Sequence, residues 1–133
     1  MTTLKKSTDL SVREKTARIL DWITEKKGRD MLALDLSGLA GFAESLIIVT
    51  ATSVRQAQAL ADDILERCKQ EHIEFLHMEG YNSGQWILLD LNDVVVNIFQ
   101  AEARELFNLE GLWSGARIID DRRSASLTAS EDE

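Results

Sequence analysis

Two aspartates, Asp90 and Asp93, stand three positions apart in the stretch WILLDLNDVVVNIF, between two strongly apolar runs. Paired carboxylates beside β-strands can hold a divalent metal ion, which can activate a nucleophile or clamp a phosphate group. Aspartates at this spacing can also end the strands of a hairpin and accept hydrogen bonds from the turn. Their place in the predicted hairpin decides between metal chemistry and turn geometry.

The predicted hairpin has both aspartates at its turn. Only Leu91 and Asn92 lie between Asp90 and Asp93, and asparagine tolerates the positive φ that a two-residue turn requires. In this register Asp90 lies opposite Asp93, and both carboxylates can accept N–H groups of the turn. The pattern therefore favours a structural role for the two acids.

A metal-dependent nucleotidyltransferase is the alternative interpretation of these carboxylates. Its third ligand would be Asp35, which ends another apolar run. The stretch around it, DLSGLAG, has no phosphate-binding glycine motif, and Cys68, His72 and His77 do not have the spacing of zinc ligands. The sequence thus predicts turn residues, with no catalytic group, metal or cofactor.

Alternation along the hairpin strands divides their side chains between two faces. One face is purely aliphatic and is expected to pack under helices. The other mixes aromatic, aliphatic and amide side chains, and its candidate partner-binding residues are Trp86, Leu88, Val95, Asn97 and Phe99. The register pairs Trp86 with Asn97 and Leu88 with Val95. Apolar groups ringed by polar ones are typical of a protein-binding site, although a second helix layer, such as the segment RELFNLEGLW, could instead cover them.

The rest of the chain predicts an α/β domain. Helical periodicity indicates helices over 11–27 and 52–71, and short apolar runs indicate further strands over 31–36, 45–50 and 73–78. The last two strands flank a helix and are expected to run parallel. We therefore expect a mixed sheet of about five strands, with helices packed mainly on one face.

Length and composition predict one domain. The chain has 133 residues, and 44% of them are hydrophobic, which suffices for one core. We assign residues 1–116 to this domain and expect the polar segment 117–133 to be a disordered tail. No apolar run approaches the length of a membrane span, so no membrane association is expected.

Charge and cysteine content bear on partners and location. The formal net charge of −8 disfavours direct binding to nucleic acid and suits a basic protein partner. A single cysteine excludes an intrachain disulfide and fits a reducing cytoplasm. A cytoplasmic protein that binds another protein is the expectation from these features.

Three collinear blocks resemble the ribosomal silencing factor family, also called RsfS or Iojap-like. They are ALDLSGLAGFAESLIIVTATSVRQAQALAD, MEGYNSGQWILLDLNDVVVNIF and RELFNLEGLW, and the resemblance extends from about Arg29 to Trp113. It implies a mixed-sheet α/β domain with a nucleotidyltransferase-like topology that lacks the catalytic acids.

The resemblance also implies a function. Such proteins bind the fourteenth protein of the large ribosomal subunit, block its association with the small subunit, and repress translation when nutrients are limited. Their contact residues include the tryptophan that matches Trp86, whereas Asn97 stands where a histidine is common and Asn92 where a glycine is common. The expected function is that of a repressor without catalytic activity, and a homodimer formed through the same sheet face is a weaker alternative.

Overall fold

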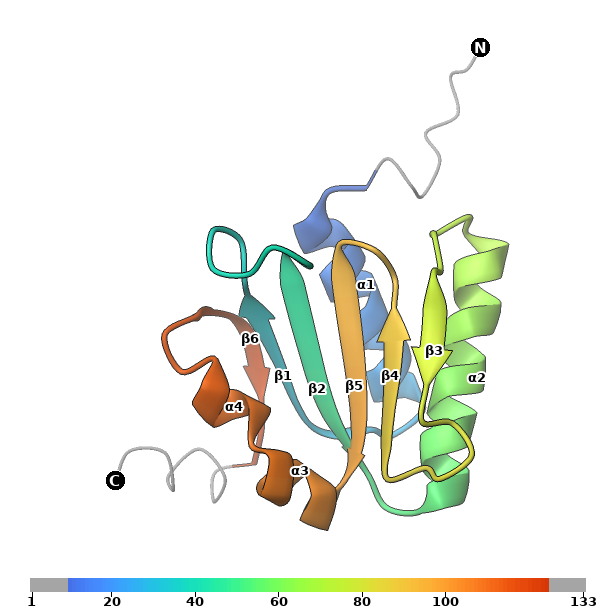
Figure 1. Ribbon diagram of the computed structural model, residues 1–133. Coiled ribbons are helices and arrows are strands. Elements are labelled where there is room, and N and C mark those ends of the chain that lie inside the picture. The colour runs from blue at the N-terminus through green and yellow to red at the C-terminus, as the bar shows by residue number, and fades with distance from the viewer. Residues whose placement is uncertain (1–9, 125–133) are drawn as a thin grey trace.

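A computed structural model describes residues 10–124, which form one mixed β-sheet with helices on both faces (Figure 1). The elements are α1 (Val12–Glu25), β1 (Arg29–Asp35), β2 (Ser45–Ala51), α2 (Val54–Gln70), β3 (His77–Glu79), β4 (Trp86–Asp90), β5 (Val94–Gln100), α3 (Ala101–Phe107), α4 (Leu109–Leu112) and β6 (Arg117–Arg122). The strand order is β3-β4-β5-β2-β1-β6, and the neighbours β2 and β5 are parallel while the other neighbours are antiparallel. The predicted mixed α/β fold is confirmed, with six strands in the sheet where about five were expected.

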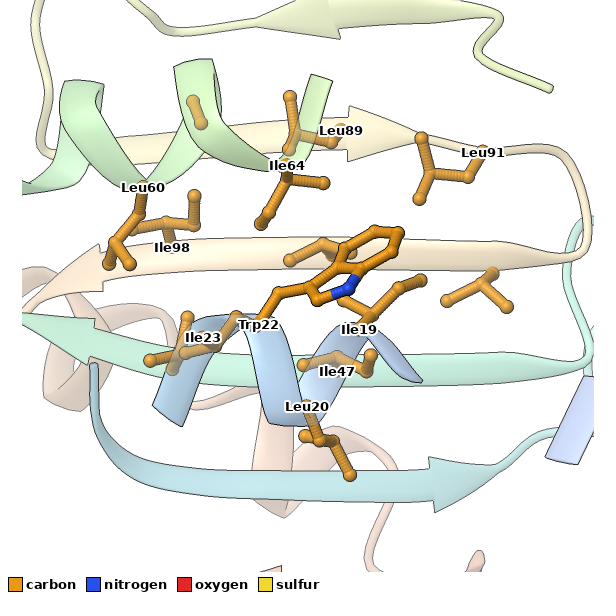
Figure 2. Close-up of a cluster of buried hydrophobic side chains, with 14 of the residues drawn as sticks. Ile19, Leu20, Trp22, Ile23, Ile47, Leu60, Ile64, Leu89, Leu91 and Ile98 are labelled. Carbon is orange, nitrogen blue, oxygen red and sulfur yellow. The ribbon is translucent and has the colours of Figure 1, made fainter. Parts of the chain in front are cut away.

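The main core lies between the sheet and the two long helices, α1 and α2. Ser11 begins α1 with a capping box, and Ser53 begins α2 by accepting the N–H of Gln56. Both helices direct an apolar stripe at the aliphatic face of the sheet, where Ile19 and Ile64 are almost wholly buried (Figure 2). None of the helices between residues 10 and 124 is long and apolar enough to cross a bilayer.

A second, smaller core lies on the opposite face. The short helices α3 and α4 and the loop of residues 36–44 pack there against apolar side chains of β1, β2 and β5. The pair of short helices covers only part of this face, as Figure 1 shows: α4 lies beside β6 and β1, and α3 lies at the lower ends of β2 and β5. The long helices are therefore on one face, as expected, and the other face is partly covered.

The C-terminal boundary differs from the prediction. Residues Arg117–Arg122, which were assigned to a disordered tail from their polar composition, form β6 and pair antiparallel with β1. An edge strand needs one row of backbone hydrogen bonds and few buried side chains, so a charged sequence can adopt it. The rest of the predicted tail from residue 125 onward lies outside the described residues.

The hairpin register also differs, by two residues. Its true pairs are Trp86 with Phe99, Leu88 with Asn97 and Asp90 with Val95. Leu91, whose N–H donates to the Val94 carbonyl at 2.9 Å, is fully buried and extends the ladder past Asp90. The turn is thus Asn92–Asp93, with Asn92 at φ 78°. A shift of two residues leaves every side chain on its predicted face.

Candidate protein-binding site

The sheet brings the five predicted binding residues together on one face, but at different depths. Phe99, Asn97 and Val95 are buried, with exposed fractions of 0%, 1% and 6%. Trp86 and Leu88 on β4 are half-buried. Val95, Asn97 and Phe99 are therefore covered in the free protein, because α3, α4 and the neighbouring loop complete a core over this part of the sheet, and Trp86 and Leu88 supply its accessible surface.

The indole of Trp86 lies between two phenylalanine rings. Its centroid is 4.9 Å from that of Phe99 beneath it and 4.8 Å from that of Phe107 at the end of α3. Its Nε1 donates to Asn97 Oδ1 at 2.9 Å, and Asn97 Nδ2 donates to the Ile47 carbonyl at 3.3 Å. The buried phenylalanine and asparagine therefore fix the orientation of a tryptophan that stays partly accessible.

Asn97→Ala is expected to destabilise the fold by about 1–3 kcal/mol, because the Ile47 carbonyl and the indole N–H each lose a partner in a mostly buried site. Urea unfolding monitored by circular dichroism measures this loss. Asn82→Ala, in the exposed loop before β4, separates the general effect of losing an asparagine from loss of the buried hydrogen bonds. A loss below about 0.5 kcal/mol for Asn97→Ala would contradict the positioning role.

Trp86 is surrounded by further apolar and polar side chains that are not among the five predicted binding residues. Phe107, from the segment RELFNLEGLW, is 51% exposed and widens the apolar surface. On the other side, β3 places Glu79 opposite Leu88 and His77 opposite Asp90. We call Trp86, Leu88 and Phe107 the aromatic patch; His77, Glu79 and Asp90 form its polar rim.

The two central carboxylates have separate structural roles. Asp90 Oδ1 accepts the Asn92 N–H at 2.9 Å, as predicted for a turn residue. Asp93, predicted to do the same, instead pairs with the buried ammonium of Lys15 on α1. Asp93 therefore lies in the turn as predicted, but the two-residue shift places its carboxylate next to α1, where it binds Lys15 in place of a turn N–H.

The third proposed ligand, Asp35, is engaged locally. It accepts both the N–H and the hydroxyl of Ser37, and these bonds hold the pKa of its carboxyl below the usual value. Burial raises the pKa of the Cys68 thiol to about 11, which keeps it protonated and unreactive at neutral pH. Within residues 10–124, no group of three or more histidine, cysteine or acidic side chains is arranged to hold a metal.

The surface can therefore bind by shape and apolar contact. A half-buried tryptophan, held by a buried amide and flanked by a phenylalanine, is the kind of anchor that carries much of the energy of protein–protein interfaces. The carboxylates of the rim can pair with a basic partner.

Comparison with known proteins gives a consistent result. The family described as "Ribosomal silencing factor during starvation" matches residues 9–133. A ribosomal silencing factor of Bacillus subtilis is 38% identical over 96 residues, which cover 72% of this chain and 81% of the relative. One of Haemophilus influenzae is 36% identical over 96 residues, covering 72% and 94%.

Solved structures agree. A protein of Chromobacterium violaceum has a TM-score of 0.77 and 30% identity, with 79% of this chain and 88% of that chain covered. The fold, the match along nearly the whole sequence and the similarity to several relatives point to the same conclusion. The chain belongs to the ribosomal silencing factor family, RsfS.

Proposed function

We propose that this protein binds the large ribosomal subunit through its fourteenth protein and blocks association with the small subunit. It acts in the cytoplasm, without catalysis, and represses translation under nutrient limitation. The observation that carries the proposal is the aromatic patch: Trp86 is oriented from beneath yet accessible from above, next to Phe107. The family description, which names silencing during starvation, supports the physiological part.

Steric exclusion requires only stable docking at the right place. A specific interface buries on the order of 1,200–2,000 Å² in total, about 20–30 residues on each side. The aromatic patch and its rim supply the centre of such a contact. A domain held on the intersubunit surface then occupies volume that the small subunit needs.

Electrostatics support a basic protein as the docking partner. The chain has a formal net charge of −8, and the polar rim next to Leu88 includes the carboxylates of Glu79 and Asp90. Opposite charge speeds the encounter and selects the partner, whereas the half-buried Trp86 supplies affinity. Self-association through the same patch would compete with docking.

Subunit association on sucrose gradients tests the proposal. Large subunits preincubated with the protein are expected to form fewer complete ribosomes when small subunits are added. Leu88→Glu is expected to abolish this inhibition, because it places a charge in the half-buried centre of the patch. Leu39→Glu is the matched control, since Leu39 is 55% exposed in the loop of residues 36–44. Unchanged ribosome formation with the wild-type protein would refute the proposal.

A further inference from the structure

The cations of this acidic protein are unevenly distributed. Lys26, Lys27, Arg29 and Arg55 are exposed and make no ion pair among residues 10–124. Most other arginines and lysines in that part of the chain are paired with carboxylates; they are Arg13, Lys15, Arg18, Arg67, Arg104, Arg122 and Arg123. The unpaired cations concentrate at the end of the sheet where α1 ends and α2 begins, at the bottom of Figure 1.

Hydrogen bonds hold this basic end together. Gln56 Nε2 donates to the carbonyls of Lys26 and Lys27, at 3.4 and 3.2 Å, and Gln56 Oε1 accepts the N–H of Thr52. The end of α1 is thereby fixed against the first turn of α2, where Arg55 lies. Backbone that is fixed in this way presents the cations as a group.

The position of Arg55 does not stabilise its positive charge. Lys26 and Lys27 stand at the C-terminus of α1, where the helix dipole favours positive charge. Arg55 stands in the first turn of the 17-residue α2, where the dipole disfavours it, and no carboxylate within residues 10–124 pairs with it. A bound anion would stabilise all three.

The carboxylates at this end are mostly engaged elsewhere. Glu25 pairs with Arg67 at 2.6 Å, and Asp30 accepts the N–H of Ser124. Asp30 and Glu102, which is exposed in the first turn of α3, line a depression of about 550 Å³ together with Arg29. The four exposed cations still outnumber these two carboxylates, so the charge at this end is positive although the net charge of the chain is negative.

The basic end adjoins the aromatic patch. The depression that Arg29 lines is also lined by Gln85 and Gln100, and Gln85 directly precedes Trp86. It lies where the parallel strands β2 and β5 end, an edge at which α/β proteins commonly bind ligands. If a partner docks on Trp86, the molecules next to that partner come close to these cations.

We propose that the basic end contacts the RNA phosphate backbone beside the docking protein, so that the domain binds protein and RNA together. This inference rests on the proposed ribosome docking. Phosphates match unpaired lysines and arginines, and among the residues that line the depression none is aromatic, which indicates backbone contact without base stacking. The expectation of no nucleic-acid contact from net charge alone is revised by the local distribution.

Fluorescence anisotropy with a labelled single-stranded oligouridine tests RNA binding by the full chain. Lys26→Gln/Arg55→Gln is expected to weaken binding roughly tenfold at about 150 mM salt and to lower the salt slope by about 1.4. Lys69→Gln/Arg117→Gln removes equal charge from two other exposed cations that make no ion pair within residues 10–124, and it is expected to change affinity by less than about twofold. Glu102→Gln is expected to strengthen RNA binding, because it removes a negative charge from the depression.

Two outcomes would overturn the inference. One is an equal loss of RNA affinity in both double variants, and the other is no RNA binding by the wild-type protein at about 50 mM salt.

Binding to the purified docking protein without RNA separates this inference from the proposed function. Lys26→Gln/Arg55→Gln is expected to bind that protein as the wild type does. A loss in this assay would mean that the basic end contacts protein, and the inference would be wrong. If Leu88→Glu still binds the docking protein fully, the proposed function fails, whereas the RNA result is unaffected.

Discussion

Trp86→Ala is expected to lower the affinity for the large ribosomal subunit by about 30-fold or more, equivalent to about 2–4 kcal/mol. The indole lies between Phe99 and Phe107, with its N–H bonded to Asn97, so its orientation is fixed before a partner binds. An anchor that is ordered before binding loses little entropy on binding. Truncation removes the apolar contact area and leaves Phe107 without its neighbour.

Cosedimentation with purified large subunits over a range of protein concentrations measures this loss. Phe42→Ala is the matched control, because Phe42 is another exposed aromatic, 59% accessible, that contacts Trp113 away from the patch. Circular dichroism establishes that each variant is folded. If Trp86→Ala cosediments as well as Phe42→Ala does, the aromatic patch is not the docking surface.

The faces of the hairpin could be predicted from the sequence, although its register could not. Side chains alternate with a period of two, so pairing Trp86 with Asn97 or with Phe99 places the same residues on the same face. The register depends on Leu91, which is buried and continues the strand pairing to Val94. That burial comes from α1 and α2, which are distant in sequence.

The depth of each site residue could not be predicted for a similar reason. Phe99 and Asn97 are buried because the chain returns over the sheet as α3 and α4 and completes a second core. The apolar segment that forms these helices was visible, and cover by it was one of two open interpretations. The cover is partial, because it buries Phe99 and leaves Trp86 half-accessible.

The geometry suggests a structural role for residue 97, where this chain has asparagine and the family resemblance leads one to expect histidine. Asn97 is 1% exposed in the free protein, and its amide bridges the indole and the Ile47 carbonyl. A histidine or an asparagine at this position would act on a partner by orienting Trp86. Asparagine in place of histidine would therefore affect the orientation of Trp86 and leave the apolar surface of its indole unchanged.

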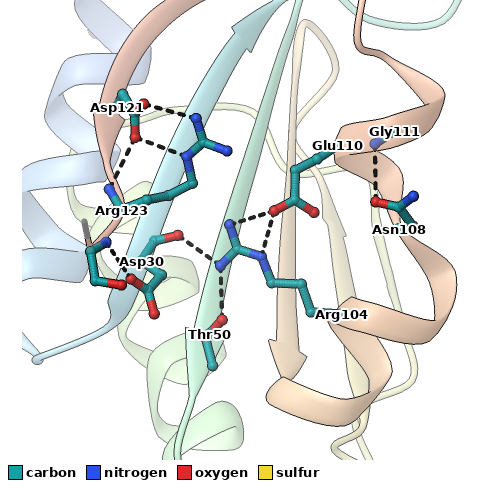
Figure 3. Close-up of polar contacts among 9 residues, drawn as sticks. Asp30, Thr50, Arg104, Asn108, Glu110, Gly111, Asp121 and Arg123 are labelled. Carbon is teal, nitrogen blue, oxygen red and sulfur yellow. Dashed lines mark hydrogen bonds and ion pairs between the residues drawn. The ribbon is translucent and has the colours of Figure 1, made fainter. Parts of the chain in front are cut away.

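Arg104→Ala is expected to destabilise the protein by about 3–5 kcal/mol, the range for removing one partner of a buried ion pair. Arg104 on α3 is 5% exposed, and its guanidinium donates to Glu110, to the Asp30 carbonyl and to Thr50 Oγ1 at 2.7–2.9 Å (Figure 3). Truncation leaves the Glu110 carboxylate, 15% exposed, without its cation. Arg13→Ala is the control, because Arg13 is exposed and 4.0 Å from Asp35, and it should cost less than about 0.5 kcal/mol.

The same variant connects stability to binding. Arg104 ties α3 to β1 and β2, and α3 carries Phe107 against the indole of Trp86. Arg104→Met/Glu110→Leu, which removes both charges, is expected to recover much of the stability that Arg104→Ala loses, because no unpaired carboxylate then remains. Urea unfolding measures the stability of both variants. Cosedimentation with large subunits should show weaker binding for Arg104→Ala and recovered binding for the double variant. A loss below about 1 kcal/mol for Arg104→Ala, or a double variant less stable than it, would show that the ion pair does not hold α3 in place.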